Sequence, residues 1–287
     1  MKTYLRNAMP LLVAALSLTN AQDASAQAAP PLGTVQQFSV LGGSGVSGST
    51  GAGTIVTGDV GSFPTCFITN FPPSTVAGGG FVLHGPVVCD GTVPTARADA
   101  TAAFLALNQG VGTVIADQLA GQSLPPAVYT FTTTTADIAG GGTLTLTGGA
   151  GSIYVFRTGS TLTANVTSAI NFGAVNPCNV YWQVGSSATI NANFGGNIFA
   201  SASVTIGSGA NLTGRAIAGT GAVTMAGGGG NTIGGCATPQ AVPTPTPTPT
   251  PVPPGPPVPP VPTLPQAAAG GLLALLVITG TLVLARR

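Results

Sequence analysis

The sequence predicts a mainly β protein whose short strands stack as a β-solenoid, with one long α-helix packed alongside. Three observations support this prediction: a four-residue pattern recurs, an apolar residue precedes it at constant distance, and one alanine-rich stretch has helical periodicity. The pattern reads TLTL at 143–146, TLTA at 161–164, SATI at 187–190, SVTI at 203–206 and AVTM at 222–225.

The first 26 residues have the features of a secretory signal peptide. Lys2 and Arg6 precede an apolar run, and residues 24–26, Ala-Ser-Ala, match the small-residue cleavage pattern. We therefore expect an exported chain whose folded domain spans residues 27–237. Its first part, residues 32–64, alternates short apolar segments with glycine-rich turns.

A helix is predicted at residues 95–109, directly after Pro94. The stretch is rich in alanine, and its small residues recur at helical spacing, which favours close packing along the side of a solenoid. The stripe consists of Ala96, Ala100, Ala103 and Leu107.

The repeats themselves predict one polar and one apolar face, because strand side chains alternate between faces. The threonine at the third position recurs after 18, 26, 16 and 19 residues, and we interpret each step as one solenoid coil. These threonines are Thr145, Thr163, Thr189, Thr205 and Thr224. The apolar residues seven positions before the last four are Phe156, Trp182, Ile198 and Ile217.

A second outward column, two residues earlier, adds more hydroxyl groups. Neighbouring strands lie about 4.8 Å apart and alternate residues about 6.7 Å apart, so the two columns would form a flat grid of hydroxyls and methyls. Such a grid could order water and match a crystalline surface. The candidate binding residues are Thr143, Thr145, Thr161, Thr163, Ser187, Thr189, Ser203, Thr205 and Thr224.

Four cysteines in an exported chain indicate disulfides, and four cysteines permit three pairings. We favour Cys66 with Cys89 and Cys178 with Cys236, because each pair would join one local region. The absence of a C-x-x-C motif argues against a zinc site.

The carboxy-terminal region changes character twice. Residues 238–262 are a Pro/Thr-rich linker, which favours a semi-rigid polyproline II spacer. Within residues 263–287, the 19 uncharged residues 267–285 precede Arg286 and Arg287 and are long enough to span a bilayer. We therefore expect membrane engagement through this segment.

The composition argues against nucleic-acid binding and against catalysis. Only 5% of residues are charged, and residues 30–239 hold three arginines, five aspartates and no lysine or glutamate. Nucleic-acid recognition draws on clustered basic residues. Glycoside hydrolysis usually needs two carboxylates, yet no acidic residue follows Asp137. His84 is the only histidine, so we predict no enzyme, cofactor or metal.

Several segments follow one another in order between Leu32 and Cys236, among them LGTVQQFSVLGGSGVSG, YVFRTGSTLT, CNVYWQVGSSATI and NLTGRAIAGTGAVTM. Together they resemble the ice-binding-like proteins that carry domain of unknown function 3494. The resemblance implies a right-handed β-solenoid of triangular cross-section, a long helix beside it and a flat face that adsorbs to ice. The VPTLP sequence at 261–265 is similar to carboxy-terminal sorting signals headed by Ile-Pro-Thr-Leu.

The sequence thus predicts an exported, surface-tethered ice-binding protein whose partner is ice or ordered water. A signal peptidase and a sorting transpeptidase are the expected processing partners. The alternative is a structural or adhesive surface module that binds glycan or extracellular matrix. Ice shaping by the isolated domain would distinguish the two.

Overall fold

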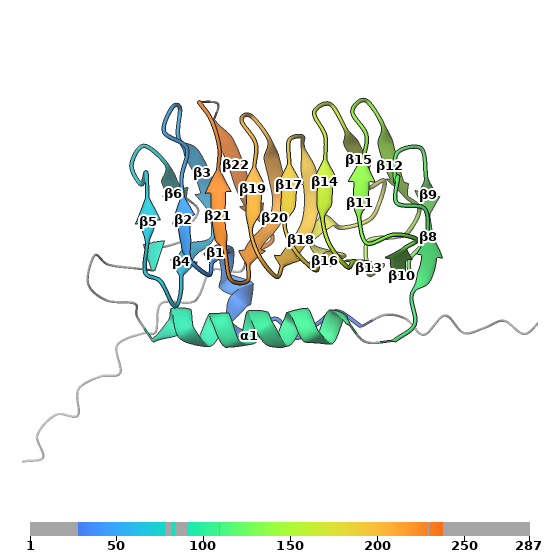
Figure 1. Cartoon of the computed structure of the whole chain (residues 1–287), viewed down its shortest axis with the longest axis horizontal. Coiled ribbons are helices and arrows are strands. Elements are labelled where there is room, and N and C mark those ends of the chain that lie inside the picture. The colour runs from blue at the N-terminus through green and yellow to red at the C-terminus, as the bar shows by residue number, and fades with distance from the viewer. Residues whose placement is uncertain (1–27, 78–81, 84–90, 109, 229, 238–287) are drawn as a thin grey trace, which may run out of the picture. The chain divides into compact units, whose positions relative to one another are not determined.

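The computed structural model describes residues 28–77, 82–83, 91–108, 110–228 and 230–237. These residues form a stack of short parallel strands with one long helix beside it (Figure 1). The predicted signal peptide, linker and carboxy-terminal segment lie outside the described residues, as do His84 and Cys89. Within the described residues, no helix is long and apolar enough to cross a membrane.

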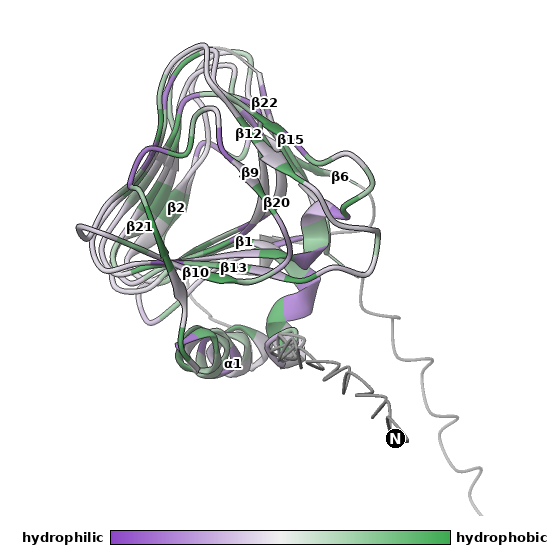
Figure 2. Cartoon of the chain, turned by 90° about the vertical axis from the view of Figure 1, so that its right-hand side faces the viewer, coloured by the Kyte–Doolittle hydropathy of each residue, from purple (hydrophilic) through white to green (hydrophobic). Residues whose placement is uncertain are grey.

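The strands lie on three sides of the stack, seen from its end in Figure 2. Every strand pair in the described part of the chain is parallel, as expected for solenoid coils. The chain runs from one side to the next, so strands on one side belong to successive passes of the chain.

The helix side faces α1. Its strands are β8 (Thr113–Ile115), β10 (Val128–Phe131), β13 (Tyr154–Thr158), β16 (Val180–Val184), the later parts of β18 (Phe194–Ala200) and β20 (Asn211–Ala218), β1 (Phe38–Gly42), β4 (Asp59–Ser62) and β7 (Val82–Leu83).

The hydroxyl side is a separate seven-stranded sheet. In spatial order its strands are β11 (Ala136–Ile138), β14 (Leu162–Ala164), β17 (Ala188–Ile190), β19 (Val204–Ile206), β21 (Ala222–Met225), β2 (Gly45–Ser47) and β5 (Ile68–Thr69).

The third side is built from a separate three-stranded sheet and from part of the larger sheet that also forms the helix side. One holds β9 (Ser123–Leu124), β12 (Thr143–Leu146) and β15 (Ala169–Asn171), and the other holds the first parts of β18 and β20 with β22 (Asn231–Gly235), β3 (Thr54–Thr57) and β6 (Thr75–Ala77). β18 and β20 bend from this side onto the helix side at Gly196 and Gly214. Both have positive φ, and a Cβ on Gly214 would overlap the Gly196 carbonyl oxygen.

The spatial order of the coils differs from their order in the chain. The amino-terminal strands pair with the last carboxy-terminal coil: β1 with β20, β2 with β21 and β3 with β22. β4, β5 and β6 then continue the stack beyond β1, β2 and β3. Residues near both ends of the domain therefore meet inside the stack.

A buried arginine ties this junction together. Arg215 donates hydrogen bonds to the Gln36 and Cys236 carbonyl oxygens, at 2.8 and 2.5 Å, and to Asn197 Oδ1 at 2.6 Å. Burial lowers the pKa of Arg215 to about 10, because a buried cation loses its hydration. The predicted disulfide between Cys178 and Cys236 is present and joins the same region.

Apolar side chains fill the interior of the stack. The rings of Tyr129, Phe156 and Trp182 stack with centroid distances of 5.3 and 4.2 Å. Phe156, Trp182 and Ile198 share one register column, as predicted.

The prediction that Ile217 is the fourth member of this column is wrong. Ile198 pairs with Ala216, while Ile217 pairs with Phe199 and packs toward the helix. Ala200 pairs with Ala218 and Val204 with Val223, so the later coil has one extra residue between these positions, and counting back seven residues from Thr224 misplaces the column.

The helix α1 spans Thr92–Leu107 and begins three residues before its predicted start. Pro94 lies inside the first turn, where a backbone N–H has no intrahelical acceptor and proline is tolerated. The predicted stripe of Ala96, Ala100, Ala103 and Leu107 is buried, as expected. It packs against apolar residues of the helix side, including Leu41, Val155, Tyr181, Phe199 and Ile217.

Candidate functional site

The hydroxyl side is a continuous sheet whose strands share one burial pattern. In β14, β17 and β19 the first and third residues are buried and the middle residue is half-buried. Val204 and Ile206 of β19, for example, are fully buried in the core on either side of Thr205. This pattern fixes the middle residue of each strand on the outer surface.

Four of the predicted threonines form one column across this sheet. Thr163 pairs in register with Thr189, Thr189 with Thr205, and Thr205 with Thr224. The column continues onto the amino-terminal strands, because Thr224 pairs with Ser47 and Ser47 with Thr69. We call these six residues the hydroxyl ladder: Thr163, Thr189, Thr205, Thr224, Ser47 and Thr69.

Thr143 and Thr145 do not belong to this ladder, which corrects the prediction of five aligned repeats. Both residues lie on β12, on the third side, where Thr143 pairs with Ala169, and Thr145 with Asn171 and Ser123. The TLTL repeat is a half-buried strand like the others, but it belongs to a different side of its coil. Asp137 occupies the position beside Thr163 instead.

The second predicted column flanks the ladder on the hydroxyl side. Its backbone carbonyls carry the pairing: Thr161 accepts from the Ala136 N–H at 2.8 Å, and Ser203 accepts from the Ala188 N–H at 2.9 Å. The column loses its hydroxyls toward the β5 end, where it finishes at Phe67, which is 57% exposed. Its members are Thr161, Ser187, Ser203, Ala222, Gly45 and Phe67.

The hydroxyl groups at the centre of the ladder are available to solvent. Within the part of the chain that the structure describes, the hydroxyls of Thr163, Thr189, Thr205 and Thr224 have no hydrogen-bond partner. Threonine hydroxyls do have hydrogen-bond partners at Asp117, which lies outside the ladder. There Thr132 and Thr133 donate to the carboxylate, and chiefly the Thr133 hydroxyl bond lowers the pKa of Asp117.

Threonine is well suited to such a surface. Its branched Cβ restricts χ1, so each methyl and hydroxyl is held in a limited set of positions. The parallel pairing on both sides of β17, β19 and β21 fixes the backbone beneath them. The ladder is therefore a preorganised array that needs little ordering when it meets a rigid partner.

The other two sides are less suited to contact with a flat surface. The helix α1 covers the helix side (Figure 2). The third side is interrupted between β15 and β18, which belong to different sheets. The hydroxyl side thus combines an uninterrupted sheet with an outer face that no other helix or strand of the described residues covers.

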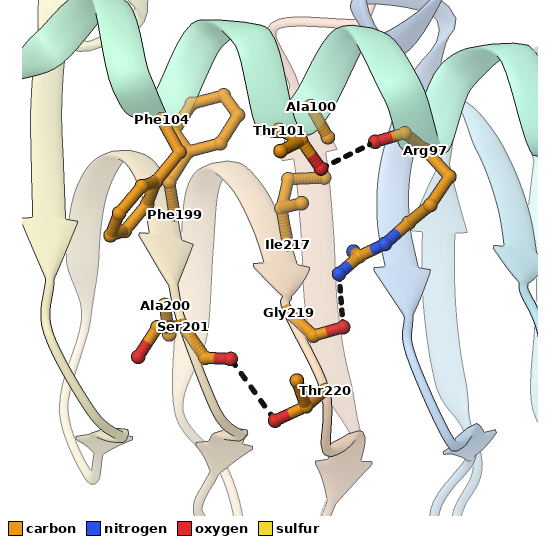
Figure 3. Close-up of a pocket in the computed structure, with 10 residues that line it drawn as sticks. All are labelled: Arg97, Ala100, Thr101, Phe104, Phe199, Ala200, Ser201, Ile217, Gly219 and Thr220. Atoms are coloured by element: carbon orange, nitrogen blue, oxygen red, sulfur yellow. Dashed lines mark hydrogen bonds between the residues drawn. The ribbon is translucent and has the colours of Figure 1, made fainter.

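A pocket of about 270 Å³ lies between α1 and the helix side (Figure 3). Phe104 and Phe199 form one end, and Arg97 donates a 2.7 Å hydrogen bond to the Ala218 carbonyl at the other. Burial lowers the pKa of Arg97. The lining holds no carboxylate or imidazole for acid–base chemistry: Arg97, Ala100, Thr101, Phe104, Phe199, Ala200, Ser201, Ile217, Gly219 and Thr220.

Sequence reasoning missed three members of the surface, Ser47, Thr69 and Asp137. Ser47 lies in the strand GVS and Thr69 in the two-residue strand IT, and neither strand has a threonine between two apolar residues as the recognised repeats do. Asp137 lies in ADI, which matches the apolar-polar-apolar alternation of the later repeats. The alternation of apolar and polar residues could have identified the Asp137 strand from the sequence, whereas a search for threonine could not.

The sequence pattern described as ice-binding-like matches residues 40–231. The chain is 37% identical over 206 residues to the ice-binding protein of Nostoc sp. (strain HG1), which covers 71% of this chain and 74% of that protein.

Solved structures show the same architecture. An ice-binding protein from the Antarctic ascomycete Antarctomyces psychrotrophicus matches with a TM-score of 0.62 and 30% identity, over 72% of this chain and 98% of that one. The domain of unknown function 3494 from Shewanella frigidimarina ice-binding protein 1 matches with a TM-score of 0.63 and 25% identity, over 73% and 98%.

Proposed function

The chain belongs to the ice-binding-like family, and from this premise we propose that it adsorbs to ice through its hydroxyl side. The observation that supports this choice of side is the hydroxyl ladder: threonines in register across an uninterrupted sheet, with hydroxyls free to bond water. No buried cleft is needed for such a function.

The mechanism follows from the chemistry of the ladder. Free hydroxyls at a regular spacing bind water molecules in a regular arrangement, while the methyl groups between them leave water through contact with the ice. A buried methyl contributes about 0.8 kcal/mol. One rung is therefore too weak to offset the loss of translational and rotational freedom, roughly 4–15 kcal/mol. A flat, rigid array allows many rungs to engage together.

The direct test is ice shaping by the isolated domain, residues 27–239. We expect faceted crystals, because adsorption to particular planes slows their growth. Round, unshaped discs at high protein concentration would reject adsorption to ice. Binding on a glycan array would then favour the adhesive alternative.

We further propose that the protein is exported and held at the cell surface. The Cys178–Cys236 disulfide supports an oxidising compartment. The signal peptide at residues 1–26, the linker at 238–262 and the carboxy-terminal segment at 263–287 are proposed from the sequence.

The tether is tested by deleting residues 267–287, which form the uncharged segment and its terminal arginines. We expect release of the truncated protein into the medium, measured by immunoblotting of cell and medium fractions. Retention of the truncated protein at the level of the intact chain would show that another feature holds it.

A further inference from the structure

We propose that Asp137 sets one end of the ice-contacting surface, so that adsorption begins at Thr163 instead of at the first strand of the hydroxyl side. This inference rests on the proposed function and deepens it by assigning the boundary of the same site. Asp137 acts here as a specificity-determining residue, because it decides how many rungs can engage.

Asp137 occupies the position next to Thr163 at which the hydroxyl ladder would continue. It pairs in register with Thr163, in the same column as the hydroxyl ladder. Like those residues it is half-buried, between the buried Ala136 and Ile138. It is also the only ionisable side chain on the seven strands of the hydroxyl side.

The carboxylate is held in place from both directions. Gln118 Nε2 donates to Oδ2 at 2.6 Å, and Asn165 Nδ2 donates to Oδ1 at 2.8 Å. The Gln118 amide is itself oriented, because its Oε1 accepts from the Ala120 and Ala139 N–H groups at 2.8 and 3.1 Å. Asp137 is therefore fixed on the surface beside the ladder by two oriented donors.

A fixed carboxylate opposes adsorption to ice for two reasons. Charge-assisted hydrogen bonds hold its water more strongly than a neutral hydroxyl does, and in orientations set by the charge. Removing that water without a compensating partner is costly. Ice can supply no cation, so contact is expected to stop at Thr163. A threonine at 137 would instead add a neutral hydroxyl and a methyl to the column.

Edge protection is the competing explanation for this charge. β11 is the last strand of its sheet, and beyond it only the isolated Gln118–Asp137 bridge is present in the described residues. Charged residues on edge strands commonly discourage pairing with other chains. That role would make an uncharged variant associate but would not change its affinity for ice.

The test compares Asp137→Thr with the unmodified full chain. One more methyl removed from water is worth about 0.8 kcal/mol, so we expect roughly a fourfold rise in affinity for ice. The measurement is the fraction of protein taken up by a slowly growing ice hemisphere, over a range of concentrations. Light scattering of the same samples reports association.

Two further variants make the result decisive. Asp117→Asn removes a carboxylate that lies outside the ladder, so its ice uptake should equal that of the unmodified chain. Asp137→Asn keeps the side-chain size while removing the charge, and it should bind ice more tightly than the unmodified chain even if Asp137→Thr folds poorly. Melting curves identify the folded variants.

Ice uptake by folded Asp137→Asn equal to that of the unmodified chain would overturn the boundary role, as would increased association without increased uptake. These results are distinct from failure of the proposed function, in which the unmodified chain itself is not taken up by ice.

Discussion

Replacement of Thr205 by lysine tests the hydroxyl ladder at its centre. Thr205 lies between Thr189 and Thr224 in register, with strands paired on both sides. An extended lysine would project roughly 4 Å beyond the threonine methyl, given ordinary bond lengths. A crystal surface cannot yield to that side chain, so the neighbouring rungs are lifted from the ice together.

The expected loss can be estimated from the rungs affected. If the methyl groups of Thr189, Thr205 and Thr224 all lose contact, about 2.4 kcal/mol is lost at 0.8 kcal/mol each, which is roughly 60-fold in affinity. The fold should tolerate the change, since substitutions at outward positions typically alter stability by about 0.5 kcal/mol. We therefore expect near-normal melting together with a large fall in ice uptake.

Two controls separate surface effects from folding effects. Thr213→Lys places the same charge on the exposed third side and should leave ice uptake unchanged. Val204 directly precedes Thr205 and is fully buried. In Val204→Lys an unpaired charge would therefore be buried, which should prevent normal folding. Unchanged ice uptake by a folded Thr205→Lys protein would refute the ladder and direct attention to another side.

Two further predictions concern stability. The Cys178–Cys236 disulfide links residues 58 positions apart, and Cys178→Ser removes this cross-link. The free energy of unfolding should fall by about 4 kcal/mol in urea titrations, and an unchanged midpoint would contradict this. Burial raises the pKa of Tyr129 to about 12, so its neutral form is favoured in the folded state, and the stability it contributes below pH 10 should be lost as pH rises toward 12. Tyr129→Phe should reduce the loss of stability between pH 9 and 12, measured by urea unfolding at each pH, and an identical pH dependence would argue against this cause.

The local elements of the fold could be predicted because they depend on local pattern. Alternation within SATI and SVTI placed Thr189 and Thr205 on the outer face, and the alanine stripe identified the buried face of α1. The register of Thr163 with Thr224 through two intermediate rungs also followed, because those coils are consecutive in the chain.

The composition of the complete site could not be predicted, for two physical reasons. Each coil contains three strands with similar alternation, so TLTL resembled the ladder strands although Thr145 lies on the third side. Spacing could not reveal that Ser47 and Thr69 join the ladder either, because their strands are added from the other end of the chain.

The junction between the amino-terminal strands and the last coil also determines the order in which the domain can be made. The Arg215 bond to Gln36 joins residues 179 positions apart, and β1 and β2 have their neighbours in β20 and β21. During synthesis β1, β2 and β3 can pair with β4, β5 and β6, but their other edge has no partner until the last coil has been produced. Contacts of such long sequence separation slow folding. The junction is consequently expected to remain open until synthesis is nearly complete, and in a nascent chain lacking residues after 210 the amino-terminal strands should be highly sensitive to protease.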